Sequence, residues 1–265
     1  MPHEEGPKEP VRITVLGKSP AWQDADGACT GYLVEGGGQV VLLDCGPGVF
    51  AKLRRHIAYE AVDAIIITHL HADHVLDLVP YASGLRYRPW PGKPPRPRLI
   101  APPGARETFA ALCEGGSMDP QHLELAFDLS IYSPSDTLKL GGLRVRFQPV
   151  PHYIPANAVE FECDGARFTF SADCGPSPEL SAFAAGTDLL LIEATLPQAE
   201  PNPDDRGHLT PFEAGEHAAR AEAKRLVLTH FSAELGADWV CAEAARAYAG
   251  PIVAAHEGAI YELGR

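Results

Sequence analysis

The chain has 265 residues, 45% of them hydrophobic, which is enough for the core of one large α/β domain or two small ones. Its 22 basic and 35 acidic residues give a net charge of −13, and so acidic a surface repels nucleic acid and counts against a nucleic-acid partner. Residues 1–10 are polar and lack the apolar segment of a signal peptide, and no stretch is long and apolar enough to cross a membrane. We expect a disordered tail over residues 1–10 and a single domain over residues 11–265.

The six cysteines are scattered along the chain, and none forms a Cys-x-x-Cys pair. A chain of this length does not need disulfides to stabilise it. We therefore expect reduced, mostly buried thiols and a cytoplasmic location.

The first part of the chain alternates between apolar runs and turn residues. The run from Val11 to Gly17 predicts a strand, and the runs 32–35 and 40–44, on either side of a glycine turn, predict a hairpin. Residues 49–56 predict a helix. The apolar run from Ala64 to Ile67 is typical of a buried strand.

A group of metal-ligand residue types directly follows this buried strand: His69, His71, Asp73 and His74. In an extended segment His69 and His71 point to the same side, because side chains two apart share a face. Asp73 and His74 come one turn later, so they face a second point close to the first. Imidazole and carboxylate groups suit zinc, manganese or iron. The segment predicts a metal centre, and the alternative is a solvated polar loop.

Residues 85–98 are rich in Arg, Lys and Pro and contain no acidic residue. If this segment lies at the mouth of the site, its cations would contact phosphate, and Tyr87 and Trp90 would stack on a base. The alternative is a solvated Pro-rich loop. The basic residues that we expect to bind substrate phosphate are Arg86 and Arg88, with Lys93, Arg96 and Arg98.

The rest of the chain alternates between strands and helices. A capping box with proline at the first helical position begins a helix at Thr210 that runs to about Ala223. Asp164-Gly165 is a strong turn signal inside the hairpin that we expect over residues 159–170. The other predicted elements are strands 99–101, 138–140, 143–147, 189–193, 226–230, 252–254 and 260–263, with helices 105–113 and 239–249.

The two halves of the chain contain similar segments. Residues 40–47 resemble residues 168–176, and residues 65–69 resemble residues 226–230. In each copy an apolar strand ends in a residue that can bind a metal. Two equivalent halves predict two packed sheets with helices outside, and a site at the edge that the strand ends share.

The segment His69-x-His71-x-Asp73-His74 resembles the signature of the metallo-β-lactamase-fold hydrolases, and its Asp-His ending is similar to the two-metal branch that includes ribonuclease Z and several phosphodiesterases. The resemblance extends from about Val11 to about Leu263. It implies a four-layer αββα sandwich of two pseudo-symmetric halves and two divalent ions, Zn²⁺ first, with Mn²⁺ or Fe²⁺ as alternatives.

The same resemblance implies where the remaining ligands lie. His69, His71 and His152 would hold one ion. Asp73, His74 and His230 would hold the other, and Asp173 would bridge the two. Asp44 would orient a ligand histidine, although a helix-capping role is the alternative.

Glu193 and His208 form a further expected pair, because ribonuclease Z-like enzymes have a matching glutamate and histidine beside the metals that help to protonate the leaving oxygen. A structural hydrogen bond is the alternative. The expected catalytic residues are Asp73, Glu193 and His208.

The remaining histidines have no ligand pattern. We expect His56, His122 and His217 in solvent, and His256 in the core or behind a ligand.

Three functions compete. The first is a metal-dependent phosphodiesterase for a small substrate, such as a cyclic nucleotide. The second is the tRNA 3′-processing endonuclease ribonuclease Z. That family carries a long tRNA-binding arm at the place where, in this chain, His152 and Asp173 are only 21 positions apart. Hydrolysis of other esters, lactones or β-lactams also fits such a site. The third is non-hydrolytic: a mononuclear or di-iron redox protein, or a metal-binding partner without catalysis. A homodimer is left open.

Overall fold

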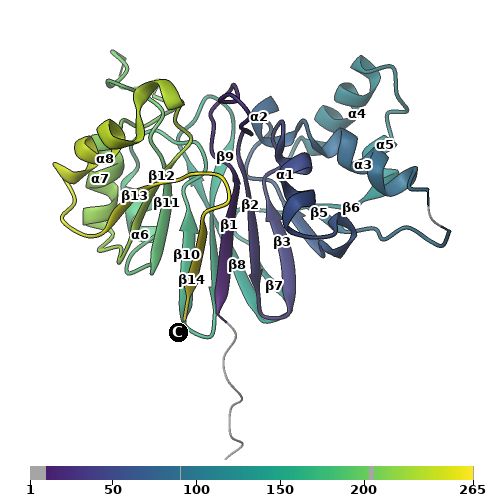
Figure 1. Cartoon of the computed structure of the whole chain (residues 1–265), viewed down its shortest axis with the longest axis horizontal. Helices are drawn as coiled ribbons and strands as arrows, with labels where there is room; N and C mark the ends of the chain where they lie inside the picture. The colour runs from purple at the N-terminus through teal and green to yellow at the C-terminus, as the bar shows by residue number, and fades with distance from the viewer. Residues whose placement is uncertain (1–9, 90, 203–205, 265) are drawn as a thin grey trace, which may run out of the picture.

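Two β-sheets pack face to face, and helices cover the outer face of each (Figure 1). The computed structural model describes residues 10–89, 91–202 and 206–264, so the expected disordered tail lies outside the described residues except for Pro10. The assignment of residues 11–265 to one domain stays a prediction.

The first sheet has the order β14 (Ile260–Leu263), β1 (Val11–Gly17), β2 (Gly31–Gly36), β3 (Gln39–Leu43), β4 (Ala64–Ile66), β5 (Arg98–Ala101) and β6 (Asp128–Ile131).

The second sheet repeats the plan of the first. In both, antiparallel strands lead into a run of parallel strands. The order is β7 (Thr137–Leu140), β8 (Leu143–Val150), β9 (Ala156–Cys163), β10 (Ala166–Phe170), β11 (Leu189–Glu193), β12 (Leu226–Thr229) and β13 (Ile252–Ala254).

Three hydrophobic clusters separate the four layers. The central cluster joins the facing sides of the two sheets, as where Tyr32 of the first sheet meets Phe170 of the second at a ring-centroid distance of 5.0 Å. The second cluster lies between the first sheet and its helices, and the third lies between the second sheet and its helices. The helices are α1 (Val49–His56), α2 (Ala72–Val75), α3 (Leu78–Arg86), α4 (Ala105–Gly115), α5 (His122–Ala126), α6 (Pro178–Phe183), α7 (Pro211–Arg220) and α8 (Ala237–Ala245), with short 3₁₀ turns at Tyr59–Ala61 and Ala233–Leu235.

The predicted four-layer α/β sandwich is confirmed, and the sheet orders refine the predicted internal repeat. When the two orders are superposed, β3 corresponds to β10, as the similarity of residues 40–47 and 168–176 predicts. The second similarity matches the wrong strands. It compares β4 with β12, whereas β4 corresponds to β11, the parallel neighbour of β10. Both apolar segments lead into Thr-His, so the sequence pattern alone does not show that β4 and β12 hold different places in their sheets.

The sequence gives no clear signal for three short elements. Strand β6 lies at a sheet edge and is mostly exposed, so it lacks the apolar pattern of a buried strand. Helices α5 and α6 are single turns or little more, and α6 is capped by the Ser177 side chain, which accepts a hydrogen bond from the Leu180 amide. In contrast, the predicted Asp164-Gly165 turn is present, with positive φ at both residues. Among the described residues, no helix combines the length and the apolar character that spanning a bilayer requires.

The predicted environments of three histidines are wrong. His122 and His217 are buried, although both were expected in solvent, and His256 is exposed. His217 packs between α7 and α6, where its Nδ1 donates to Ser181 Oγ at 2.7 Å and its Nε2 accepts from the Ser177 amide at 3.4 Å. Both bonds are made by the neutral ring. Burial, with the charge of Arg220, lowers the pKa of His217 to about 4.

His217 should therefore make the fold sensitive to mild acid. In the unfolded chain this histidine takes up a proton near pH 6.5, and in the folded chain only near pH 4. The contribution of neutral His217 to the free energy of unfolding is therefore complete above pH 6.5 and is lost as the pH falls toward 4. Between pH 7 and pH 5 the loss should be about 2 kcal/mol. We expect His217→Gln to lose correspondingly less stability over this interval in urea unfolding, with exposed His56→Gln as control. Equal pH dependence of wild type and His217→Gln would contradict the assignment.

Candidate metal centre

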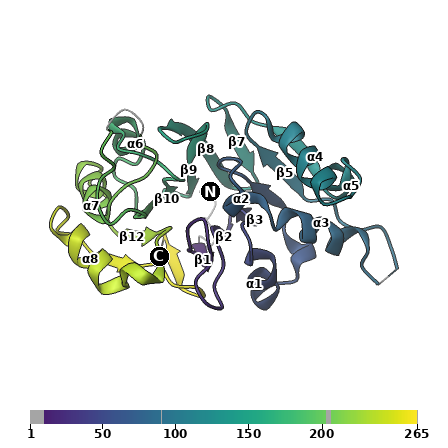
Figure 2. The same cartoon turned by 90° about the horizontal axis from the view of Figure 1, so that it is seen from above.

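The candidate site lies at one edge of the two sheets, where the parallel strands of both end. Asp44 follows β3, and His69 follows β4. From the other sheet, Asp173 follows β10, Glu193 ends β11 and His230 follows β12. Parallel neighbours place their carboxyl ends at the same edge, so the sheet topology gathers these side chains. Figure 2 shows the strands of the two sheets from above.

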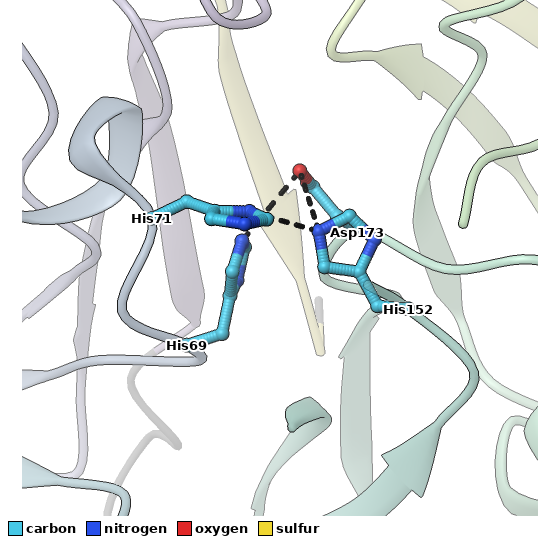
Figure 3. A group of neighbouring side chains, drawn as sticks. All are labelled: His69, His71, His152 and Asp173. Atoms are coloured by element: carbon cyan, nitrogen blue, oxygen red, sulfur yellow. Dashed lines mark hydrogen bonds and ion pairs between the residues drawn. The ribbon is translucent and has the colours of Figure 1, made fainter. Parts of the chain in front are cut away.

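The first group of ligand atoms joins the two sheets (Figure 3). His69 and His71 come from the loop after β4, and His152 and Asp173 come from the second sheet. His69 Nε2 lies 3.7 Å from Asp173 Oδ2, His152 Nε2 lies 3.9 Å from the same oxygen, and His152 Nε2 lies 3.0 Å from His71 Nδ1. Four ligand atoms so close together match the donor set of a metal ion.

The second group adjoins the first and shares Asp173 with it. His230 Nε2 lies 3.2 Å from Asp73 Oδ2 and 3.3 Å from Asp173 Oδ2. His74 Nε2 lies 3.3 Å from Asp173 Oδ1 and 3.6 Å from Asp73 Oδ2. All seven residues that the sequence predicts as ligands thus lie in two adjoining groups, each of which could hold a metal ion.

Unpartnered buried atoms mark the space between these side chains. His69 Nε2, His74 Nε2 and Asp173 Oδ1 are buried and have no hydrogen-bond partner. A buried polar atom without a partner is costly, and a cation in this space would satisfy all three. The residues present therefore fit a metal centre.

Each half of the molecule holds one candidate ligand histidine through a threonine and a carboxylate. Thr68 Oγ1, two residues after β4, donates to Asp44 at 2.8 Å and accepts from His69 Nδ1 at 3.0 Å. Thr195 Oγ1, two residues after β11, donates to Glu193 at 2.6 Å and contacts His230 Nδ1 at 2.9 Å. These bonds fix the ring that presents Nε2 to the site, which is how outer partners orient metal-binding imidazoles.

Two further contacts complete the support. His74 Nδ1 donates to Asp44 Oδ2 at 2.8 Å, and His152 Nδ1 donates to the Gly207 carbonyl at 2.7 Å. Asp73 is placed by close backbone packing, because a side chain at Gly46 would lie 1.8 Å from the Asp73 carbonyl oxygen. Only glycine fits there.

The charges suit a cation. Burial lowers the pKa of His69, His71 and His152, which favours the neutral ring that binds metal. Burial alone would also lower the pKa of His74, but Asp173 and Asp44 raise it well above its usual value. Burial opposes ionisation of Asp73, but His230 and His74 lower its pKa to about 2. The carboxylates thus attract positive charge into the centre.

His208 and Glu193 meet beside the second group. His208 Nδ1 donates to Glu193 Oε1 at 2.8 Å. Glu193 is fully buried and also accepts from the amides of Cys174 at 2.7 Å and Leu209 at 3.1 Å. Burial alone would lower the pKa of His208, but Glu193 raises it to about 9. The imidazole therefore carries a proton at neutral pH.

A pocket of about 380 Å³ opens onto these residues. Sequence reasoning finds its candidate metal ligands and His208 but misses the other lining residues, among them Trp22, Tyr153 and Thr195. Of these three, only Tyr153 lies next to a predicted ligand in the sequence. The pocket is lined by Pro20, Ala21, Trp22, His71, Ala72, Asp73, Tyr153, Asp173, Thr195, His208 and His230.

The basic segment does not line this pocket in the described part of the chain. Arg86 binds His122 Nδ1 at 2.7 Å, and Arg88 binds the Lys93 carbonyl at 3.0 Å. Tyr87 is 68% exposed, and Trp90 lies outside the described residues. Substrate binding by Arg86, Tyr87 and Arg88 stays a prediction that their described contacts do not support, and binding by Trp90 stays a prediction.

The fold and the two His/Asp groups define a metal-dependent hydrolase of the metallo-β-lactamase type. The family model for the β-lactamase superfamily domain matches residues 39–231, and the chain belongs to this superfamily. A ribonuclease Z of Mycobacterium marinum is 30% identical to it over 83% of this chain and 86% of that protein.

Solved structures share the fold. The metallo-β-lactamase fold protein YhfI of Bacillus subtilis is 25% identical, with a TM-score of 0.83 over 96% of this chain and 100% of that one. Yeast PDE1 is 14% identical, with a TM-score of 0.73 over 97% of this chain and 100% of that one, which shows a shared fold.

Asp44 should control metal affinity without touching the metal. Asn tolerates the left-handed backbone at this position, where φ is 57°. Asp44 accepts three bonds on two oxygens, from the amide and the hydroxyl of Thr68 and from His74. An Asn has only one accepting oxygen and an NH2 group in place of the other, so it cannot accept all three, and the anchor of the two candidate ligand rings is weakened. We expect Asp44→Asn to bind Zn²⁺ about 10- to 100-fold more weakly in chelator competition. Asp63→Asn, the same change at an exposed loop position, is the control. Unchanged affinity in a folded Asp44→Asn variant would contradict this role.

Proposed function

We propose that the protein is a dinuclear metal-dependent phosphodiesterase that acts on a small substrate such as a cyclic nucleotide. One observation carries this proposal: two His/Asp groups share Asp173, and His208, which is hydrogen-bonded to the buried Glu193, lies beside them in the same pocket. Neighbouring cation sites suit a phosphodiester, because the substrate is an anion with two oxygens that change charge during cleavage.

The ligands of one ion would be His69, His71, His152 and Asp173, and those of the other Asp73, His74, His230 and Asp173. Divalent ions bound there, with Zn²⁺ as our first choice, supply charge for the phosphoryl oxygens and lower the pKa of water. The protein fixes these side chains in advance through Thr68, Thr195 and Asp44.

His208 has the properties of a proton donor for the leaving oxygen. Its Nδ1 is occupied by Glu193, and the ring lines the pocket, so Nε2 is the nitrogen available to substrate. Glu193 keeps the ring protonated and in place. General acid catalysis by such a group lowers the barrier for leaving groups that depart as poor anions.

The proposal of a compact substrate has two supports. The pocket of about 380 Å³ is at the small end of ligand sites. The segment between His152 and Asp173 is filled by the hairpin β9–β10 with its Asp164-Gly165 turn, which leaves no length there for a long arm. A net charge of −13 adds repulsion toward a polynucleotide. A cytoplasmic location and a homodimer remain predictions.

Transfer-RNA 3′ processing is the second candidate. It is favoured by the 30% identity to a protein named ribonuclease Z over 86% of that protein's length. The chemistry would be the same, and the difference lies in how substrate is held.

A substrate panel separates these candidates. We expect cleavage of bis-p-nitrophenyl phosphate and cyclic nucleotides, and little or no cleavage of a precursor tRNA, a lactone or a β-lactam under the same metal condition. Product formation on each substrate is measured at low and high salt. Efficient, salt-sensitive cleavage of precursor tRNA at its 3′ end would replace the first candidate with the second.

The role of His208 can be tested through leaving groups. An alkoxide such as a ribose 3′-oxygen needs a proton as it leaves, whereas p-nitrophenolate is already a stable anion. We expect His208→Ala to slow cleavage of a cyclic nucleotide by roughly 10²–10⁴-fold and bis-p-nitrophenyl phosphate far less, with metal content retained. Glu193→Gln should act in the same direction, more weakly. An equal loss on both substrates would show that His208 positions substrate or metal instead.

A further inference from the structure

Two large aromatic side chains lie exposed at the pocket that holds the candidate metal centre. Trp22 is 54% exposed and Tyr153 is 53% exposed, and both line the pocket together with His208 and His230. Neither belongs to the hydrophobic clusters between the layers. Exposed aromatic groups contribute little to folding, so their place at the pocket calls for another explanation.

The loop that carries Trp22 is bound to the segment that follows β12 and contains His230. Lys18 Nζ binds the Asp24 carboxylate and the Phe231 carbonyl, the latter at 2.9 Å. Asp24 also accepts from the Ala233 amide at 2.9 Å. Phe231 directly follows His230, so these contacts fix the loop against the chain that carries a ligand.

The other end of this loop is held as firmly. The Ala28 amide donates to Glu257 at 2.6 Å, and Lys52 binds both the Asp26 carbonyl, at 2.7 Å, and Glu257. Anchored at both ends, the loop holds the backbone of Trp22 at the pocket. A loop that is already ordered loses less conformational entropy when a ligand binds.

Tyr153 is fixed by a different set of contacts. Its hydroxyl binds Glu200, which also accepts from the Gly207 amide at 3.2 Å. The ring lies against the backbone at Gly207, where a Cβ atom would come within 2.5 Å of the ring carbon Cζ. Ring centroids of Tyr153 and His208 are 5.5 Å apart, so this aromatic surface adjoins the candidate proton donor.

The rest of the pocket lining is consistent with recognition by stacking. In the described chain the lining contains no Arg or Lys, and Pro20, Ala21 and Ala72 add apolar surface beside Trp22 and Tyr153. The charged group of a substrate would be met by the metal-binding side and His208. The aromatic side of the pocket would then contact a flat, uncharged part of the same substrate.

We propose that Trp22 and Tyr153 stack on the planar heterocycle of the substrate, so that the enzyme selects phosphodiesters that carry a nucleobase. This inference rests on the proposed phosphodiesterase function and names its substrate class. Stacking of a base on an aromatic side chain tolerates different bases, because every base has a π face. The pair therefore selects a nucleotide over a base-free ester without selecting strongly among the bases.

The decisive experiment compares two esters with the same leaving group, thymidine 5′-(p-nitrophenyl phosphate) and methyl p-nitrophenyl phosphate. Loss of one stacking contact typically weakens binding by about 1–3 kcal/mol, or about 5- to 150-fold. We expect Trp22→Ala and Tyr153→Ala to lower the preference in kcat/KM for the thymidine ester by a factor in this range, mainly through KM. Trp22→Phe should keep most of it. Trp239→Ala, which removes another exposed tryptophan on α8, is the matched control.

Binding without turnover gives a second readout. We expect AMP to bind the metal-loaded protein more tightly than ribose 5-phosphate, and to quench tryptophan fluorescence in wild type but much less in Trp22→Phe. Both effects should persist in Trp239→Ala.

The possible results distinguish a failure of the proposed phosphodiesterase function from a failure of the stacking role of Trp22 and Tyr153. If wild type cleaves neither ester, the proposed function fails, while the comparison of AMP with ribose 5-phosphate still decides the stacking role. An unchanged preference in Trp22→Ala and Tyr153→Ala overturns the inference, as does an equal loss on both esters. A loss of preference in Tyr87→Ala instead would assign the base to residues 85–98 and also overturn it.

Discussion

Asp173 is the group on which the site depends, because one buried carboxylate faces imidazoles from both sheets. It lies within 4 Å of His69, His74 and His230, and its Oδ1 has no hydrogen-bond partner. A charge in this position is costly to bury unless a cation or a proton balances it. The packing of the two sheets is therefore coupled to what occupies the space between these side chains.

Much of this could be predicted from the sequence, because buried strands ending in ligand residues carry a strong local signal. The run from Ala64 to Ile67 followed by His69 and His71 predicts both a strand and its chemistry. The pocket walls could not be predicted in this way. Trp22 and Tyr153 lie in loops whose positions are set by contacts distant in sequence, such as Lys18 with Phe231 and Glu200 with Gly207.

The basic segment shows the opposite case: its sequence signal is clear, but its described residues do not line the pocket. Its arginines bind protein atoms: Arg86 binds His122, and Arg96 binds the carbonyls of Glu124 and Phe127. These contacts fasten the segment to α5, an element with no sequence signal of its own. His122 was expected in solvent because α5 and its packing on α3 were not foreseen.

The two halves use the same framework for different tasks. Asp44 and Asp173 follow corresponding strands, and Thr68 and Thr195 likewise. Asp44 accepts bonds from the amide and hydroxyl of Thr68 and from His74, so it is satisfied within the protein and acts only through its neighbours. Asp173 keeps an oxygen without a hydrogen-bond partner. Corresponding carboxylates thus differ in what surrounds them: Asp44 holds its neighbours in place, whereas Asp173 belongs to two groups that could each hold a metal ion.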